Sequence, residues 1–234
     1  MSKRSEIIDG KDAPGQKSGL IYTEVLGWVD LGHAQGADIR QLLNNFSRGE
    51  TSGKEYYEVR YSQGMTTPYS IFRSGKLLTW RIKHGRPDWE QKNIALAMMM
   101  TVARKFEFFQ GVFPNNWVTD SSYSGEDLVS DLLGFYRVVS IQNPFSMLRP
   151  VSKAEALKRW DYYGKIGSWK NETFQPLLFP DPDKSPHSRP RKGLLPPFMR
   201  TISPYHDFQS GNVILPQHGK TFAILGASNG REGL

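Results

Sequence analysis

The stretch Gly27-Trp-Val-Asp-Leu-Gly-His-Ala34 lies where an apolar segment gives way to a predicted helix. Asp30 is placed to cap the first turn of that helix, which we expect from Leu31 to Phe46. Apolar residues recur along it at helical spacing: Ile39, Leu42, Leu43 and Phe46. At about 100° per residue, His33 lies nearly opposite this apolar face. His33 therefore has either a partner outside its own helix or simple exposure to solvent.

A second polar stretch, Asp120-Ser-Ser-Tyr-Ser-Gly-Glu-Asp-Leu128, precedes a helix predicted to run to about Val139. Ser124 and Asp127 have the spacing of a capping box. Glu126 and Asp127 lie near the helix N-terminus, where backbone N–H groups stabilise anions and negatively charged transition states. We expect the two stretches to face each other across one cleft. Helix capping alone also accounts for the residue types found here.

The order of the remaining elements predicts an α+β fold, with helices packed on a small antiparallel sheet. Residues 1–18 are polar and predict a flexible arm, and residues 19–165 form the expected core domain. Residues 166–234 are rich in proline but keep apolar side chains, which predicts an extension wrapped over the domain. That extension is expected to end in a hairpin joining residues 212–215 to residues 221–225.

Between these segments the sequence predicts a short meander and further helices. Alternating residues indicate strands at 55–61, 69–73 and 76–83, the last two joined by a turn at Ser74-Gly75. Helical spacing and capping residues indicate helices at 86–110, 124–139 and 152–163.

The composition limits the classes of chemistry and partner. The chain has no cysteine, which excludes disulfides, cysteine-bound metals and a thiol nucleophile. Its net charge of +7 favours an anionic partner, but Lys and Arg form no continuous run, so nucleic acid is not expected. No signal peptide and no membrane span are recognised, so we expect synthesis in the cytoplasm and export, if any, by another route.

Hydrolysis without cysteine requires a hydroxyl nucleophile, a pair of carboxyl groups, or a metal ion held by His, Asp and Glu. His33 is the candidate general base or metal ligand. Glu126 or Asp127 would orient it, bind a divalent metal ion or act as an acid. The attacking group would be water, Ser122 or Ser124. The sequence contains no P-loop, no HExxH and no GxSxG motif.

Residues Gly27–His33 and Ser121–Gly134 together resemble an uncharacterised bacterial family of cell-envelope proteins. Its members carry a Gly-x-hydrophobic-Asp-x-x-His segment and a later Ser-x-aromatic-Ser-x-Glu-Asp-Leu helix start. The chain also resembles type VI secretion effectors described as peptidoglycan hydrolases. The resemblance covers roughly residues 20–140. It implies that His33, Asp30, Glu126 and either Ser122 or Ser124 belong to one site.

The order helix, meander, helix is also similar to papain-like cell-wall peptidases of the NlpC/P60 type. The chain departs from them because it lacks their cysteine nucleophile. A serine would have to replace it, the scaffold would have to use a metal or carboxylate mechanism, or the site would not be catalytic.

The resulting hypothesis is a peptidoglycan hydrolase of amidase or peptidase type, delivered as an antibacterial toxin to the periplasm of a target cell. Its expected partners are the anionic cell-wall polymer and a cognate immunity protein. One alternative is a non-enzymatic binding protein that uses the proline-rich segment. A second alternative is a muramidase with two carboxyl groups, such as Glu58 and Glu126.

Overall fold

The helices and sheets are divided between two units in a computed structural model that describes residues 2–66, 72–110, 123–215 and 220–225. Unit 1 comprises Met1–Gln41 and Glu107–Pro204, and unit 2 comprises Leu42–Phe106 and Tyr205–Leu234. The boundary falls within two helices, α1 (Ala37–Glu50) and α2 (Asp88–Gln110), so each unit is built from distant parts of the sequence.

Each unit has its own small sheet, which confirms the predicted α+β class. In unit 1 the strand order is β1-β2-β5-β6, with two antiparallel pairs and one parallel contact between β2 and β5. Its strands are β1 (Leu20–Thr23), β2 (Gly27–Asp30), β5 (Leu177–Leu178) and β6 (Arg191–Lys192). Its helices include α3 (Asp127–Val139) and α4 (Lys153–Tyr163). Ser152 caps α4 as its sequence predicts, accepting from the Glu155 backbone N–H at 3.3 Å.

Short 3-10 turns join these elements. They are η1 (Arg4–Glu6), η2 (Gly10–Gly15), η3 (His33–Gln35), η6 (Pro144–Met147), η7 (Ile166–Ser168) and η8 (Pro197–Arg200).

The core of unit 1 is aromatic. Trp28 of β2 meets Trp160 of α4 edge to face, with ring centroids 5.8 Å apart. Phe179, from the proline-rich segment, is fully buried in the same cluster. Its backbone N–H and carbonyl are both bonded to the Tyr22 hydroxyl, at 2.8 and 2.7 Å. This part of the proline-rich segment is therefore an integral part of the core.

Residues 1–18 differ from the expected flexible arm. Ile7 and Ala13 are fully buried, and the Gly10 backbone N–H donates to the Val151 carbonyl at 3.1 Å. The polar composition of the segment conceals these anchors, because two apolar side chains and a few backbone hydrogen bonds suffice to hold a short segment.

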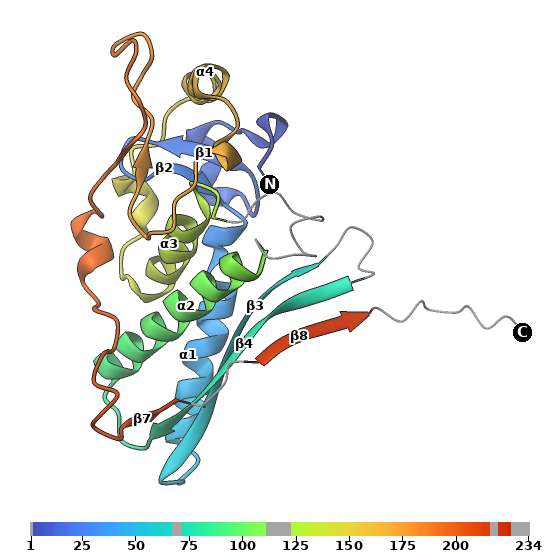
Figure 1. The fold of residues 1–234 in the computed structure, drawn as a ribbon. Coiled ribbons are helices and arrows are strands. Elements are labelled where there is room, and N and C mark those ends of the chain that lie inside the picture. Colours follow the sequence, from blue (N-terminus) through green and yellow to red (C-terminus); the bar gives the residue numbers. More distant parts are fainter. Residues whose placement is uncertain (1, 67–71, 111–122, 216–219, 226–234) are drawn as a thin grey trace, which may run out of the picture. The chain divides into compact units, whose positions relative to one another are not determined.

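The sheet of unit 2 is a long antiparallel ribbon of β3 (Tyr56–Thr66) and β4 (Phe72–Lys83) (Figure 1). The predicted turn at Ser74-Gly75 is wrong, because both residues lie within β4 and pair with Met65 and Gly64. Residues 69–71 of the predicted first strand lie outside the described residues.

The expected terminal hairpin also differs from the structure. Strands β7 (Val213–Ile214) and β8 (Lys220–Leu225) each pair antiparallel with β4, at different points along it, instead of with each other. The length of β4 makes this arrangement favourable, because one strand offers enough free backbone groups for both partners.

Helix α1 begins at Ala37 and not at Leu31. Gly36 ends the preceding η3 turn with a left-handed backbone (φ 65°), which separates that turn from the helix. Gly36 also lies against the backbone of Gly134 in α3, where a Cβ atom would overlap the Gly134 carbonyl oxygen and the Val138 side chain. Close approach of η3 to α3 therefore requires glycine at this position.

Within the described part of the chain, no helix has both the length and the apolar character needed to cross a membrane.

We expect Gly36→Ala to destabilise the protein by about 3 kcal/mol, from left-handed backbone strain and overlap with α3. The matched control is Gly53→Ala, at φ 68° but with no atom within 4 Å of its added Cβ, which should cost only about 1 kcal/mol. Urea unfolding measures both changes. Equal losses in the two variants would contradict the close approach of η3 to α3.

Candidate functional site

The turn that carries His33 is fixed to α3 from both ends. The Asp30 side chain accepts from the backbone N–H groups of Gly32 at 2.7 Å and His33 at 3.4 Å, so Asp30 caps this turn and not α1. The Asp30 backbone N–H donates to the Ser130 hydroxyl of α3 at 3.0 Å. The Arg137 guanidinium, also from α3, donates to the Ala34 carbonyl.

His33 and Asp131 form an ion pair across this junction. His33 Nδ1 lies 3.1 Å from Asp131 Oδ1, and the His33 side chain is 38% exposed whereas that of Asp131 is 7% exposed. Because a carboxylate only accepts, Nδ1 carries the proton, and in the neutral ring Nε2 holds the free lone pair. His33 lies in the η3 turn and not on α1, so the helix geometry used to orient it does not apply, but it does have a partner from another element, Asp131 of α3.

The start of α3 holds a buried glutamate between two hydroxyl groups. Glu126 is 1% exposed. Its carboxylate accepts from the Ser2 hydroxyl at 2.6 Å and from the Ser124 hydroxyl. Asp127 accepts from the Ser124 backbone N–H at 3.1 Å, but α3 begins at Asp127 with Glu126 at its N-cap position, so Ser124 does not cap the helix as predicted. The hydroxyl groups of Ser2 and Ser124 are thus both donated to the Glu126 carboxylate.

A third buried acid comes from the end of α2. Glu107 is 2% exposed, and its carboxylate accepts from the Tyr123 backbone N–H at 2.6 Å. Tyr123 has a left-handed backbone (φ 52°), which is uncommon for a bulky residue. Strain of this kind is maintained when the surrounding contacts outweigh it, and here the contact is with the acidic site.

Burial and repulsion between acids shift the proton affinities of two of these side chains, Glu107 and Asp127. Burial raises the pKa of Glu107 to about 7, with further increases from the charges of Asp131 and Glu126. Burial and then the charge of Glu126 raise the pKa of Asp127 well above its ordinary value. The charge of His33 opposes both increases. Glu107 and Asp127 therefore retain protons at pH values where exposed carboxyl groups are ionised.

Neighbouring carboxylates also raise the pKa of His33. Partial burial lowers the pKa of His33, but the hydrogen bond and charge of Asp131 outweigh it, helped by Asp127 and Asp30. The net result is a pKa well above the ordinary value of 6.5. His33 is thus a protonated, acid-paired imidazole near neutral pH, and it becomes a base at higher pH.

The structure brings together most of the residues predicted from sequence. Asp30 and Asp127 act electrostatically on His33, and Glu126 is bonded to Ser124. Ser124 is 1% exposed with its hydroxyl donated to Glu126, which disfavours it as a nucleophile. Ser122 lies outside the described residues.

Glu107 and Ser2 were not predicted from the sequence, and Asp131 was noted only as one acid of residues 120–131 and was not selected as a site residue. Asp131 lies four residues after Asp127 on the same helix, and this spacing on one helical face could have revealed it. Glu107 stands between Phe106 and Phe108 in an apolar helix, which is an unusual place for an ionised side chain. No pattern in the sequence indicates Ser2.

The metal-dependent mechanism and the pair of Glu58 and Glu126 gain no support from the geometry. Among the described residues, no group of three or more His, Asp or Glu side chains is arranged to hold a metal ion. Glu58, the second carboxylate of the muramidase alternative, lies in unit 2 and pairs with Arg60 at 3.2 Å, whereas Glu126 lies in unit 1.

No protein-family model, no curated protein and no solved structure matches this chain. The chemical interpretation of the site therefore rests on its geometry.

The raised pKa values predict a protein that loses stability as pH rises from 5 to 8. A carboxyl group whose pKa is about 7 when folded, against about 4.5 when unfolded, stabilises the fold fully only below the lower value. That contribution is lost as pH passes the folded pKa, and Asp127 and His33 act in the same direction. Thermal unfolding across this pH range measures the trend.

Glu107→Gln should remove a large part of this dependence. At pH 8 the variant should be more stable than wild type by roughly 3 kcal/mol, because no charge is then buried at this position. At pH 5 the two should be similar. Glu172→Gln, at an exposed position of the same unit, is the control and should follow wild type. A Glu107→Gln variant with the wild-type pH slope would contradict the assignment.

Proposed function

We propose that the protein is a hydrolase in which His33, paired with Asp131, activates water for attack on an amide bond of bacterial peptidoglycan. The observation that carries the proposal is the His33–Asp131 pair itself: a part-exposed imidazole held through Nδ1 by a buried carboxylate. This is the arrangement in which a histidine can exchange protons at Nε2 while its orientation is fixed.

The proposed reaction follows from this geometry. The Nε2 lone pair of neutral His33 takes a proton from water as the water oxygen attacks the carbonyl carbon. The carbon–nitrogen bond then breaks, and the leaving amine takes that proton from His33. Asp131 keeps its hydrogen bond to Nδ1 throughout and stabilises the imidazolium formed in the middle step. Water is preferred to Ser124 as the nucleophile because the Ser124 hydroxyl is buried and bonded to Glu126.

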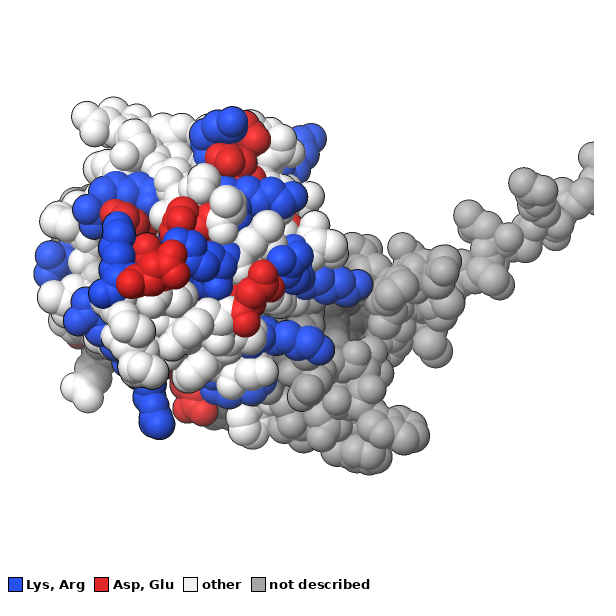
Figure 2. All heavy atoms as spheres, turned by 90° about the horizontal axis from the view of Figure 1, so that it is seen from above, with Lys and Arg blue, Asp and Glu red and all other residues white. Residues whose placement is uncertain are grey.

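The substrate class is supported by charge and by the resemblance to peptidoglycan hydrolases. A net charge of +7 favours an anionic polymer such as the cell wall. In the view of Figure 2, positive and negative side chains are interleaved, so the excess positive charge is not gathered into one patch on that face. Delivery to the periplasm of a target cell, and a cognate immunity protein in the producing cell, belong to the same proposal.

The alternative functions receive less support. A binding role for the proline-rich segment would use residues that already serve the fold, since Phe179 lies in the core and β5 and β6 complete a sheet. A muramidase would require Glu126 as an acid or a nucleophile, whereas both of its oxygens accept hydroxyl hydrogen bonds at a buried position.

His33→Ala should lower the rate of peptidoglycan cleavage by about 100-fold or more, because general acid–base catalysis is lost. The control is His206→Ala, at an exposed histidine of unit 2, which should cleave at the wild-type rate. Release of free amines identifies an amidase or peptidase, and new reducing sugar ends identify a muramidase. The assay is run with and without added divalent metal. Unchanged cleavage by His33→Ala in both conditions would reject the proposal.

The pH dependence provides a second test. Because the pKa of His33 is raised, the fraction of neutral His33 and hence kcat/KM should increase as pH rises above neutrality. Asp131→Asn removes the partner that raises this pKa, so the midpoint of the profile should move to lower pH while the maximal rate falls. A variant that is slower but keeps the wild-type midpoint would assign Asp131 a purely structural role.

A further inference from the structure

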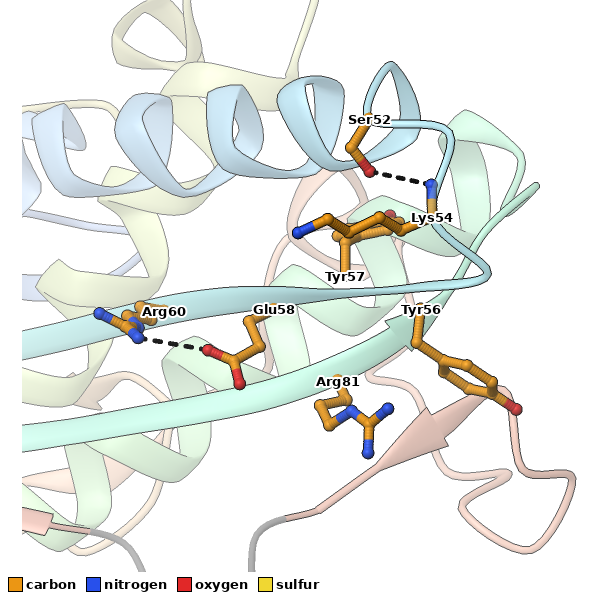
Figure 3. Close-up of a pocket in the computed structure, with 7 residues that line it drawn as sticks. All are labelled: Ser52, Lys54, Tyr56, Tyr57, Glu58, Arg60 and Arg81. Atoms are coloured by element: carbon orange, nitrogen blue, oxygen red, sulfur yellow. Dashed lines mark hydrogen bonds and ion pairs between the residues drawn. The ribbon is translucent and has the colours of Figure 1, made fainter.

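Unit 2 carries an open, polar hollow of about 640 Å³ on the ribbon formed by β3 and β4. Lys54 enters from the loop before β3, Tyr56, Glu58 and Arg60 come from β3, and Arg81 comes from β4 (Figure 3). The hollow is formed entirely by residues of one unit, and none of them belongs to the site around His33.

The alternation of β3 explains why these side chains are exposed. Tyr57, Val59 and Tyr61 are buried on one face of the strand, so Glu58 and Arg60 project from the other. Glu58 is directly opposite Arg81 in the β3–β4 register, which places the two on the same face. Figure 3 shows Glu58 between Arg60 and Arg81.

The hollow has more positive than negative charge. Arg60 pairs with Glu58 at 3.2 Å, with side chains 67% and 53% exposed. Lys54 and Arg81 make no ion pair with any residue in the described ranges, and the Arg81 guanidinium lies over the Tyr56 ring at 5.4 Å from its centroid. In unit 1, by contrast, Arg4 pairs with Asp161 and Lys158 with Asp183. Two cations of the hollow therefore remain available to an anionic ligand.

The carboxylate in the middle of the hollow selects among anionic ligands. A chain with a phosphate at every unit would bring a negative charge against Glu58, which costs free energy. A chain that carries carboxylates at intervals, with hydroxyl and amide N–H groups between them, would pair with Lys54 and Arg81 and donate to Glu58. The ring of Tyr56 adds an apolar surface at the edge for a sugar or peptide group.

We propose that this hollow is a binding subsite for the carboxylate-bearing glycan and peptide chains of the cell wall, separate from the residues that cleave them. The identity of the polymer rests on the proposed function, whereas the preference for spaced carboxylates rests on the hollow itself. Binding here would hold the protein on its insoluble substrate and raise the local concentration of cleavable bonds.

The test is co-sedimentation with insoluble peptidoglycan, with every protein carrying His33→Ala so that the wall stays intact. In this background, Lys54→Gln with Arg81→Gln should raise the half-saturating concentration at least about tenfold, because two charge-assisted contacts are lost. The control is Lys11→Gln with Lys17→Gln, which removes the same charge from exposed positions of unit 1 and should change it less than about twofold.

Other polymers test whether the hollow prefers spaced carboxylates over neutral sugars and phosphates. Neutral chitin should sediment less of the protein than peptidoglycan does. Single-stranded DNA should compete weakly, and more strongly after Glu58→Gln. Equal sedimentation of the Lys54/Arg81 double variant and its control would overturn the subsite, as would tighter binding to DNA than to peptidoglycan.

Sedimentation measures binding and the cleavage assay measures hydrolysis, so the proposed subsite and the proposed hydrolase function are tested independently. Failure of the proposed function appears as equal cleavage by wild type and His33→Ala, or as no cleavage by wild type. Failure of the subsite appears only in sedimentation. Thermal unfolding of each variant confirms that the exposed substitutions leave the fold intact.

Discussion

The ion pair between His33 and Asp131 is the interaction on which the acidic site depends. Among its described residues, unit 1 buries the carboxyl side chains of Glu107, Glu126, Asp127 and Asp131. Repulsion between such groups grows as water is excluded, and a buried acid must be neutralised, paired or hydrogen-bonded. The positive charge of His33 lowers the pKa of both Glu107 and Asp127 and so partly offsets the increase caused by burial. Backbone and hydroxyl donors from Tyr123 and Ser2 satisfy carboxylate oxygens nearby.

Several local features of unit 1 follow from the need to hold this pair together. Asp30 shapes the turn that presents His33, and the Asp30 backbone is tied to Ser130 on the helix that carries Asp131. Gly36 lets that turn approach the helix closely. Protonation of Glu107, Asp127 and His33 stabilises the fold, whereas the proposed reaction needs neutral His33. Stability and activity are therefore expected to have opposite pH dependences, a compromise common at sites built for chemistry.

The two units present opposite kinds of charge. Unit 1 contains carboxyl groups enclosed in protein, where burial changes their proton affinity. Unit 2 exposes Lys54 in the loop before β3 and Arg81 on β4, where water moderates their charge and leaves it available to a ligand. A buried acidic cluster suits proton transfer, and an exposed basic hollow suits attachment to an anionic polymer.

The sequence by itself determined the α+β class and the helices α2, α3 and α4, because helical spacing and capping act within a few residues. It also singled out His33 as a candidate, although the helix from which its orientation was inferred begins only at Ala37. Only the tertiary structure selected Asp131 as its partner, 98 residues away, and added Glu107. It likewise anchored Ile7 and made β4 continuous through Ser74 and Gly75. These outcomes depend on which surfaces pack together and exclude water. Patterns of neighbouring residues in the sequence do not determine which distant surfaces meet.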